Sequence, residues 1–261
     1  RLFSGRLKSY IRCVDVPMES SREEDFSDVQ LDVKNCKGIQ ESLRKYIEKE
    51  RLDGENQYDA GPQFGKQDAE KGAIFLRFPP VLTIQLKRFD FDLQRMCFVK
   101  VHDEYEFPER LDVSEFLATE GEGEGEDEGA DDSAKKKRKR TAEEEEDDKC
   151  NTYLLHSVLV HRGDVGGGHY YAYIRPNGHR EEDSSPDSEG KLGDWYRFDD
   201  ERVVRVPRME AVNFNYGRSA INEGTASAYM LMYLKESYVS RIMRPVASES
   251  VSSGMLDNVE K

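Results

Sequence analysis

Two short aromatic segments constrain the fold of this chain more than any other feature of its sequence. Residues 166–174 read Gly-Gly-Gly-His-Tyr-Tyr-Ala-Tyr-Ile, and residues 195–200 read Trp-Tyr-Arg-Phe-Asp-Asp. Aromatic and β-branched residues favour strands, and a polar stretch with glycine and proline separates the two segments. We therefore predict an antiparallel hairpin, in which the start of the first strand lies beside the end of the second.

The register of this hairpin decides which side chains meet. One register places His169 opposite Asp199 and, along the same ladder, Arg175 opposite Gly193. Directly opposed residues on one face lie about 5 Å apart at Cβ. A carboxylate at that distance can hold an imidazole in one tautomer and stabilise its protonated form, as in the base half of a nucleophilic triad. The alternative is that His169 is an ordinary loop residue after a glycine run.

The residue order of the two segments also resembles a known motif. Gly-Gly-His-Tyr-Tyr-Ala-Tyr followed by Trp-Tyr-Arg-Phe-Asp-Asp is similar to the histidine box of the ubiquitin-specific proteases, which are papain-like cysteine deubiquitinases. The resemblance implies that His169 is the general base, that Asp199 orients it and that Asp200 is the neighbouring acid. His156 and His161, which lie on an earlier predicted strand, are interpreted as structural.

Glycines and tyrosines supply the candidate contacts with substrate. Gly166, Gly167 and Gly168 carry no side chains, so a narrow tail such as the Gly-Gly end of ubiquitin could approach the backbone closely. The resemblance implies that Tyr105 contacts this tail from a loop that closes over it. It also places Tyr170 and Tyr229 near the substrate channel. The alternative is that Tyr105 is an ordinary sheet aromatic.

The resemblance covers residues 1–118 and 151–238, and it implies that they form one interrupted catalytic domain. A helix is predicted at about 39–51, where apolar residues recur with helical spacing. Residues 19–25 are predicted to be a charged turn. Strands are predicted at 7–14, 26–33, 73–78, 81–91, 153–161, 203–206 and 228–234.

Composition separates this domain from a charged insert. Charged residues make up 35% of the 261 residues, hydrophobic residues make up 36%, and the net charge is −14. Residues 119–150 contain a Glu-Gly repeat, a basic hexamer at 135–140 and an acidic run. Such blocks cannot bury apolar area, so we expect a disordered insert there. Residues 239–261 are polar and serine-rich, and we expect a disordered tail or linker.

Charge and hydropathy limit the partners and the location of the protein. Outside the insert the chain is only mildly acidic, and no aromatics alternate with the basic hexamer, so no specific nucleic-acid partner is expected. No apolar run is long enough to span a bilayer, so no membrane partner is expected. The hexamer is of nuclear-import type, and we expect the protein in nucleus and cytoplasm.

The cysteines argue against a metal site. Many ubiquitin-specific proteases bind a structural zinc through two Cys-x-x-Cys pairs, but the corresponding positions here hold Cys13 with Val16 and Ala60 with Gln63. A single thiol cannot make a tetrahedral site, so we predict no metal and no cofactor. The subgroup that contains the herpesvirus-associated ubiquitin-specific protease and its plant relatives is similar in this respect. Reduced thiols are expected for all four cysteines, which are Cys13, Cys36, Cys97 and Cys150.

The family's cysteine box, an Asn-x-Gly-x-Thr-Cys-Tyr run that carries the nucleophile, has no match in these residues. We therefore expect the chain to be the fingers and palm of a larger deubiquitinase, with ubiquitin and ubiquitinated proteins as partners. The nucleophile would come from a missing N-terminal thumb segment of the same protein. The predicted fold class is α+β: a papain-like ubiquitin-specific protease fold, with fingers and palm of antiparallel sheet and without the thumb.

Two other functions stay open at this point. The chain could belong to a catalytically inactive scaffold that binds ubiquitin, if its gene encodes no cysteine box. It could instead be a chromatin or nucleic-acid adaptor that uses the basic hexamer, although the net acidity disfavours this.

Overall fold

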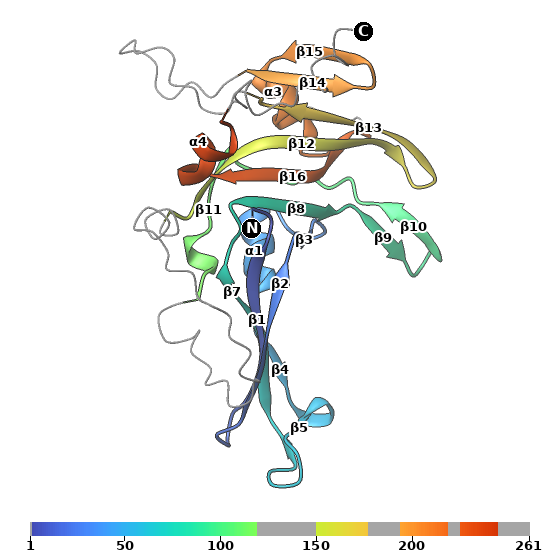
Figure 1. Cartoon of the computed structure of the whole chain (residues 1–261). Coiled ribbons are helices and arrows are strands. Elements are labelled where there is room, and N and C mark those ends of the chain that lie inside the picture. Colours follow the sequence, from blue (N-terminus) through green and yellow to red (C-terminus); the bar gives the residue numbers. More distant parts are fainter. Residues whose placement is uncertain (1, 119–149, 177–193, 219–224, 245–261) are drawn as a thin grey trace, which may run out of the picture.

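A computed structural model describes residues 2–118, 150–176, 194–218 and 225–244 (Figure 1). The predicted insert therefore lies outside the described residues except for Cys150, and most of the predicted tail does too. At the start of that tail, Val239–Ile242 form a short helix, α4, in which Arg241 lies over the ring of Tyr238.

An eight-stranded sheet forms the larger part of the molecule. Neighbouring strands in it are antiparallel, except that β3 and β8 are parallel. The order across the sheet is β15 (Arg202–Val206), β14 (Trp195–Asp199), β13 (Gly167–Ile174), β12 (Thr152–Asp164), β16 (Ser227–Lys235), β8 (Val81–Lys87) and β3 (Val29–Asp32), with β11 (Arg110–Asp112) also paired to β12.

A narrower, four-stranded sheet extends away from the large one, downward in Figure 1. Its order is β2 (Glu19–Phe26), β1 (Gly5–Cys13), β7 (Ala69–Arg77) and β4 (Glu50–Leu52). Two short hairpins complete the strands: β5 (Tyr58–Asp59) with β6 (Lys66–Gln67), and β9 (Phe89–Asp92) with β10 (Cys97–Lys100). This mixed, mainly antiparallel architecture confirms the predicted α+β class.

The helices are short. The longest described helix is α1 (Ile39–Tyr46), whose Ile39 and Leu43 are buried. The small helix α3 (Arg208–Ala211) packs against β14. Single 3-10 turns are η1 (Gly54–Asn56), η2 (Ser114–Phe116), η3 (Asn213–Asn215) and η4 (Glu236–Tyr238). None of the described helices has the length and apolar character needed to cross a membrane.

Three segments differ from the sequence prediction. The strand predicted at 81–91 is divided into β8 and β9, which belong to different sheets. The helix predicted at 39–51 ends at Tyr46, and Glu50–Leu52 form β4, because pairing with β7 outweighs local helix propensity. Residues 19–25 are part of β2 rather than a turn. Their charged side chains form cross-strand ion pairs with β1, such as Arg12 with Glu19 at 2.8 Å. Charge on an exposed edge strand is thus no sign of a turn.

A small apolar cluster, separate from the main core, lies where the narrow sheet meets the β5–β6 hairpin. Its buried members are Cys13, Ala60 and Ala69, with Val16 and Phe64 packed against them. The positions compared with zinc ligands therefore include residues that contact one another through apolar atoms. Apolar contacts therefore stabilise this region, and the absence of zinc stays a prediction.

Candidate active site

The hairpin of β13 and β14 forms as predicted, but its register differs by two residues. Tyr173 lies opposite Arg197, whereas the predicted register would have placed it opposite Trp195. A shift of two residues keeps every side chain on the same face of the sheet, because side chains alternate with a period of two. His169 and Asp199 therefore share a face as diagonal neighbours, not as directly opposed ones.

The packing of Arg175 accounts for the shift. Its buried guanidinium lies 5.0 Å from the centroid of the Trp195 ring and pairs with Glu109 at 3.2 Å. A buried charge needs such partners. The two strands therefore pair in the register that brings Arg175 beside Trp195. Gly193, the partner that we predicted for Arg175, lies outside the described residues. Strand propensity alone carries no information about this contact.

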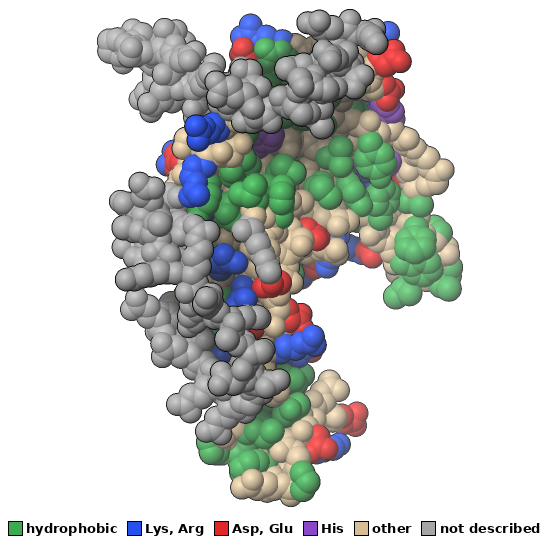
Figure 2. Space-filling view, viewed as in Figure 1, with side chains coloured by type: hydrophobic (Ala, Val, Ile, Leu, Met, Phe, Trp, Pro, Cys, Tyr) green, Lys and Arg blue, Asp and Glu red, His purple; other side chains and the backbone are tan. Residues whose placement is uncertain are grey.

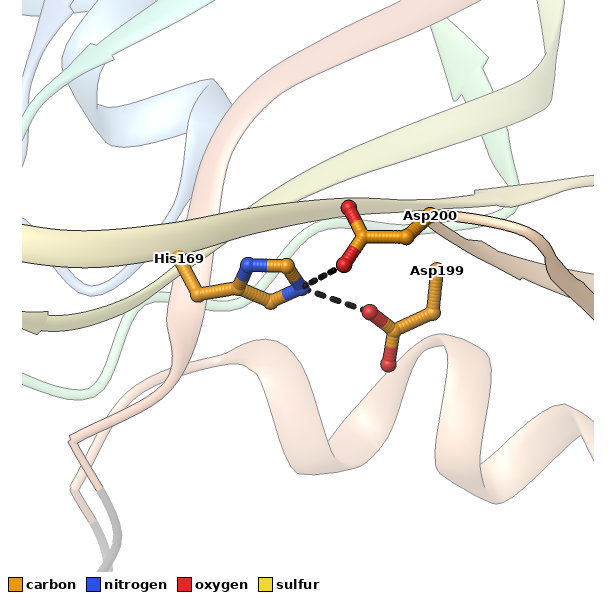
Figure 3. Close-up of side chains that lie close together, drawn as sticks. All are labelled: His169, Asp199 and Asp200. Atoms are coloured by element: carbon orange, nitrogen blue, oxygen red, sulfur yellow. Dashed lines mark hydrogen bonds and ion pairs between the residues drawn. The ribbon is translucent and has the colours of Figure 1, made fainter.

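His169 and Asp199 form the contact that defines the site. Nε2 of His169 lies 2.6 Å from Oδ1 of Asp199 and 4.0 Å from Oδ2 of Asp200 (Figure 3). The side chain of Asp199 is 31% exposed, whereas that of Asp200 is 80% exposed. The hydrogen bond with His169 is the chief cause that lowers the pKa of Asp199. Asp199 is therefore the firmly held carboxylate and Asp200 a looser neighbour.

The tautomer follows from this bond. An imidazole whose Nε2 donates its proton to a carboxylate carries no proton on Nδ1 when it is neutral. Within the described residues, Nδ1 of His169 has no hydrogen-bond partner. This nitrogen is free to accept a proton from a nucleophile placed beside it.

The same three side chains could in principle hold a metal ion. One ligand atom from each of His169, Asp199 and Asp200 lies within 4.8 Å of the others. However, the 2.6 Å bond already uses the imidazole nitrogen and one carboxylate oxygen that such an ion would need. The observed geometry is that of a hydrogen-bonded acid–base pair.

Two of the predicted substrate tyrosines meet in an aromatic cluster. The ring centroids of Tyr170 and Tyr229 lie 5.8 Å apart, and His161 and Phe89 extend the cluster at 4.7 Å from Tyr170 and 6.0 Å from Tyr229. Tyr170 lies on the face of β13 opposite to His169, because neighbouring side chains alternate. Beyond Phe89, the β9–β10 hairpin continues this surface with exposed apolar side chains, as Figure 2 shows: Phe91, Leu93, Met96 and Phe98.

The glycine loop has a packing role in addition to the predicted access. Gly166 has a φ of 97°, in the region that favours glycine. A Cβ on Gly168 would lie 2.1 Å from Nε2 of His161, whereas a Cβ on Gly167 would meet nothing within 4 Å. Gly168 thus lets β13 lie directly on the buried His161.

Lys100 is a residue that the sequence interpretation missed. Its buried amine donates hydrogen bonds to the carbonyls of His161, Gly163 and Thr225 at 2.8, 3.0 and 2.7 Å. Burial lowers its pKa to about 8. Lys100 thereby links β10 to the end of β12 and to the segment just before β16. A lone lysine among the apolar residues of 98–101 was the available signal.

Tyr105 does not lie on the surface. It is fully buried, and its hydroxyl donates to Oγ of Ser42 at 2.9 Å. Burial raises its pKa. In this conformation Tyr105 cannot contact a substrate, and its placement fits the alternative of an ordinary core aromatic.

The cysteines supply no nucleophile next to His169. Cys13 and Cys36 are buried, Cys97 is exposed on β10, and Cys150 is partly exposed. None of these described residues hydrogen-bonds His169. In the described part of the chain, the His169–Asp199 pair therefore has no thiol hydrogen-bonded to it.

These features together define a class of protein. An imidazole held by a carboxylate through one nitrogen, with the other nitrogen free, is the arrangement of the base in nucleophilic triads, among them those of cysteine peptidases. Here it stands on an antiparallel sheet beside a glycine loop.

Comparison with known proteins identifies the family within that class. The model of the family described as Ubiquitin carboxyl-terminal hydrolase matches residues 1–233, and the chain belongs to this family. The resemblance found in the histidine box is thereby confirmed.

Relatives show how much of a full protein the chain represents. It is 40% identical over 277 residues to Ubiquitin carboxyl-terminal hydrolase 15 of Saccharomyces cerevisiae, covering 100% of this chain and 20% of that protein. It is 39% identical over 281 residues to Ubiquitin C-terminal hydrolase 12 of Arabidopsis thaliana, covering 100% and 22%. The chain thus spans about a fifth of the length of these curated relatives.

Among solved structures, the chain is similar to the SAGA DUB module of Ubp8, Sgf11, Sus1 and Sgf73 bound to monoubiquitin. The TM-score is 0.61 at 26% sequence identity, covering 89% of this chain and 40% of that one. This similarity agrees with the predicted fold.

Proposed function

We propose that this chain is the base-carrying part of a thiol-dependent deubiquitinase. The enzyme would cleave the peptide or isopeptide bond after the C-terminal glycine of ubiquitin. The observation that carries the proposal is the 2.6 Å contact between His169 and Asp199 in a chain of the ubiquitin carboxyl-terminal hydrolase family. The similar SAGA DUB module is described as bound to monoubiquitin, which supports the choice of substrate.

The chemistry assigns one role to each member of the pair. Nδ1 of His169 takes the proton of a cysteine thiol, and the thiolate attacks the carbonyl carbon after the last glycine. The imidazolium, stabilised by Asp199, then gives its proton to the leaving amine, and a thioester remains. A water molecule deprotonated by the same imidazole hydrolyses the thioester and restores the thiol.

The nucleophile in this proposal comes from outside these 261 residues. The motivation is that none of the four described cysteines hydrogen-bonds His169. We assign the thiol and the donors that stabilise the oxyanion to a thumb segment of the intact protein.

The path of the substrate follows the glycine loop. Gly166 and Gly167 leave open space beside the backbone, since a Cβ on either would meet no atom within 4 Å. A tail that ends in two glycines fits such a path because neither side contributes a side chain. Tyr170 and Tyr229 would contact the tail where it enters. Tyr105 is left out of this site because it is buried.

The test is turnover of a ubiquitin–fluorophore amide by the intact protein that carries this domain. His169→Ala should remove nearly all hydrolysis, while Arg241→Ala, which changes a side chain on α4, should leave it unchanged. Full activity of the His169→Ala protein would exclude the proposal.

A catalytically inactive, ubiquitin-binding scaffold is the second candidate. The lack of a thiol next to His169 in the described residues favours it. A ubiquitin probe with a thiol-reactive C-terminus separates the two candidates. An active enzyme becomes covalently labelled, whereas a scaffold binds ubiquitin without forming a bond.

We also propose that the protein occurs in both nucleus and cytoplasm. The basic hexamer at 135–140 supports this proposal, and it lies outside the described residues. Replacing its lysines and arginines with glutamine should shift a fluorescent fusion toward the cytoplasm. An unchanged distribution in fluorescence microscopy would exclude a role for the hexamer.

A further inference from the structure

An ion-pair chain links the site to helix α3. Arg197 and Tyr173 are directly opposed on β14 and β13, on the face that carries His169 and Asp199. Arg197 donates through Nη1 to Oε1 of Glu210 on α3 at 3.2 Å. The hydroxyl of Tyr173 donates to the same oxygen at 3.3 Å. Glu210 therefore fixes one end of the Arg197 guanidinium from a separate element.

The other end of the guanidinium faces the site. Nε of Arg197 is buried and has no hydrogen-bond partner among the described residues. It lies 3.9 Å from Oδ2 of Asp199, the carboxylate oxygen that His169 does not use. A buried donor without a partner is unusual in a native protein and calls for a functional or structural reason. The nearest acceptor of opposite charge here is the orienting acid of the site.

We propose that Arg197, anchored by Glu210, is a positioning residue that fixes the Asp199 carboxylate with Oδ1 toward His169. Bound through one oxygen alone, a carboxylate can rotate about its last torsion, and the imidazole can follow it. A planar guanidinium beside the second oxygen removes this freedom, and arginine keeps its charge at any pH at which proteins are folded. The catalytic meaning of this role rests on the proposed function, whereas the geometry does not.

The pairing with Glu210 also explains how an arginine can stand near the base without opposing it. A lone cation here would stabilise the Asp199 anion and, at the same time, disfavour the imidazolium of His169. Glu210 offsets that charge, so the pair orients Asp199 while adding little net charge to the site. Other charged residues close to the pair include Asp200, at 4.0 Å from His169, Arg162, which lies opposite His169 on β12, and Arg202, which lies opposite Asp199 on β15.

The first test measures the tautomer of the His169 imidazole directly. Nitrogen NMR of the full 261-residue chain at alkaline pH should show His169 as one tautomer, protonated at Nε2. The His169→Gln spectrum assigns the signal. Arg197→Gln should yield a mixture of the two tautomers, because Asp199 is no longer fixed. Glu210→Gln should yield a smaller change, because its amide oxygen still accepts from Arg197.

Arg205→Gln is the matched control. Arg205 lies on β15 in the same sheet and forms an exposed ion pair with Asp194 at 2.6 Å, without contact to the site. Arg205→Gln should leave the tautomer of His169 unchanged. If circular dichroism shows that the Arg197→Gln protein does not fold, Arg197→Lys is measured instead. Lysine keeps the charge but cannot span both carboxylates, so a mixture of tautomers is again expected.

The second test separates this inference from the proposed function. In the intact protein, Arg197→Gln should lower kcat for a ubiquitin–fluorophore amide about tenfold, the lower end of the range for outer partners that orient metal-bound histidines. KM should stay the same, and Arg197→Lys should restore part of the loss. A single unchanged tautomer together with unchanged kcat in Arg197→Gln would overturn the inference. A mixture of tautomers in Arg197→Gln, together with no turnover by the intact wild-type protein, would uphold the positioning role and reject the proposed function.

Discussion

At the scale of single residues, the two acids beside His169 differ in how firmly they are held. Asp199 contacts Nε2 at 2.6 Å, while the more exposed Asp200 lies at 4.0 Å. In the intact protein we expect His169→Ala to lower kcat/KM by roughly a hundredfold to ten-thousandfold, the range of general acid–base catalysis. Asp199→Asn should cost less, because it keeps the shape of the pair, and Asp200→Asn less again.

Two other histidines serve as controls for this order. His156→Ala and His161→Ala should each be milder than Asp199→Asn, since neither contacts the acid–base pair. The kcat/KM for a ubiquitin–fluorophore amide is measured for all five variants. If Asp199→Asn kept full kcat/KM while His161→Ala abolished it in a folded protein, His169 and Asp199 would not be the catalytic pair.

Two neighbouring glycines give a second test at this scale. Gly168→Ala places a Cβ 2.1 Å from Nε2 of His161 and 2.8 Å from the carbonyl of Arg162. Overpacking of this kind typically costs about 1–3 kcal/mol of unfolding free energy. Gly167→Ala is the matched control because its Cβ would meet nothing within 4 Å. Urea denaturation of both variants should show the loss for Gly168→Ala alone, and equal stability would contradict the described packing.

At the scale of elements, Lys100 connects three parts of the chain that lie far apart in sequence. Lys100→Met would leave the carbonyls of His161, Gly163 and Thr225 without this donor. Each buried polar group left unsatisfied costs about 1–3 kcal/mol. We expect a clear loss in melting temperature and faster hydrogen exchange in 161–168.

Lys87→Met is the control for Lys100. Lys87 forms an exposed ion pair with Asp32 at 3.0 Å, and exposed pairs contribute about 0–1 kcal/mol. If both variants melted at the same temperature, the three hydrogen bonds of Lys100 would not stabilise the end of β12 in solution.

The elements also show what the sequence could and could not predict. Apolar and aromatic patterns located the strands of the large sheet except β11, and the motif at 166–200 predicted the contact of His169 with Asp199. Predicting the register correctly would have required the contact of Arg175 with Trp195. Predicting β2 would have required its ion pairs with β1. Both depend on residues distant in sequence. Burial of Tyr105 and the role of Lys100 were missed for the same reason, because local patterns do not report long-range contacts.

At the scale of the whole molecule, the charged insert interrupts the fold without separating its two parts. On either side of it, β11 pairs with β12, and the N–H of Val113 donates to the carbonyl of Asn151 at 3.0 Å. The chain thus leaves and re-enters the fold at neighbouring points. Replacing 119–149 with a short Gly-Ser linker should leave the melting temperature within a few degrees of the wild type, since loop length affects closure entropy only weakly. A larger drop in calorimetry would mean that the insert packs on the fold.

Separation of the base from the thiol gives the last prediction, which concerns the 261 residues as a unit. Buried thiols such as Cys13 and Cys36 are inert, and Cys97 lies on the β9–β10 hairpin without a hydrogen bond to His169. The purified chain should therefore hydrolyse no ubiquitin–fluorophore amide and form no covalent adduct with a thiol-reactive ubiquitin probe. The intact protein, assayed in parallel, should do both and should be unaffected by EDTA, because no step involves a metal. Turnover by the chain alone that iodoacetamide abolishes would show that one of its own four cysteines reaches His169, and the division of the catalytic groups between two segments would then be wrong.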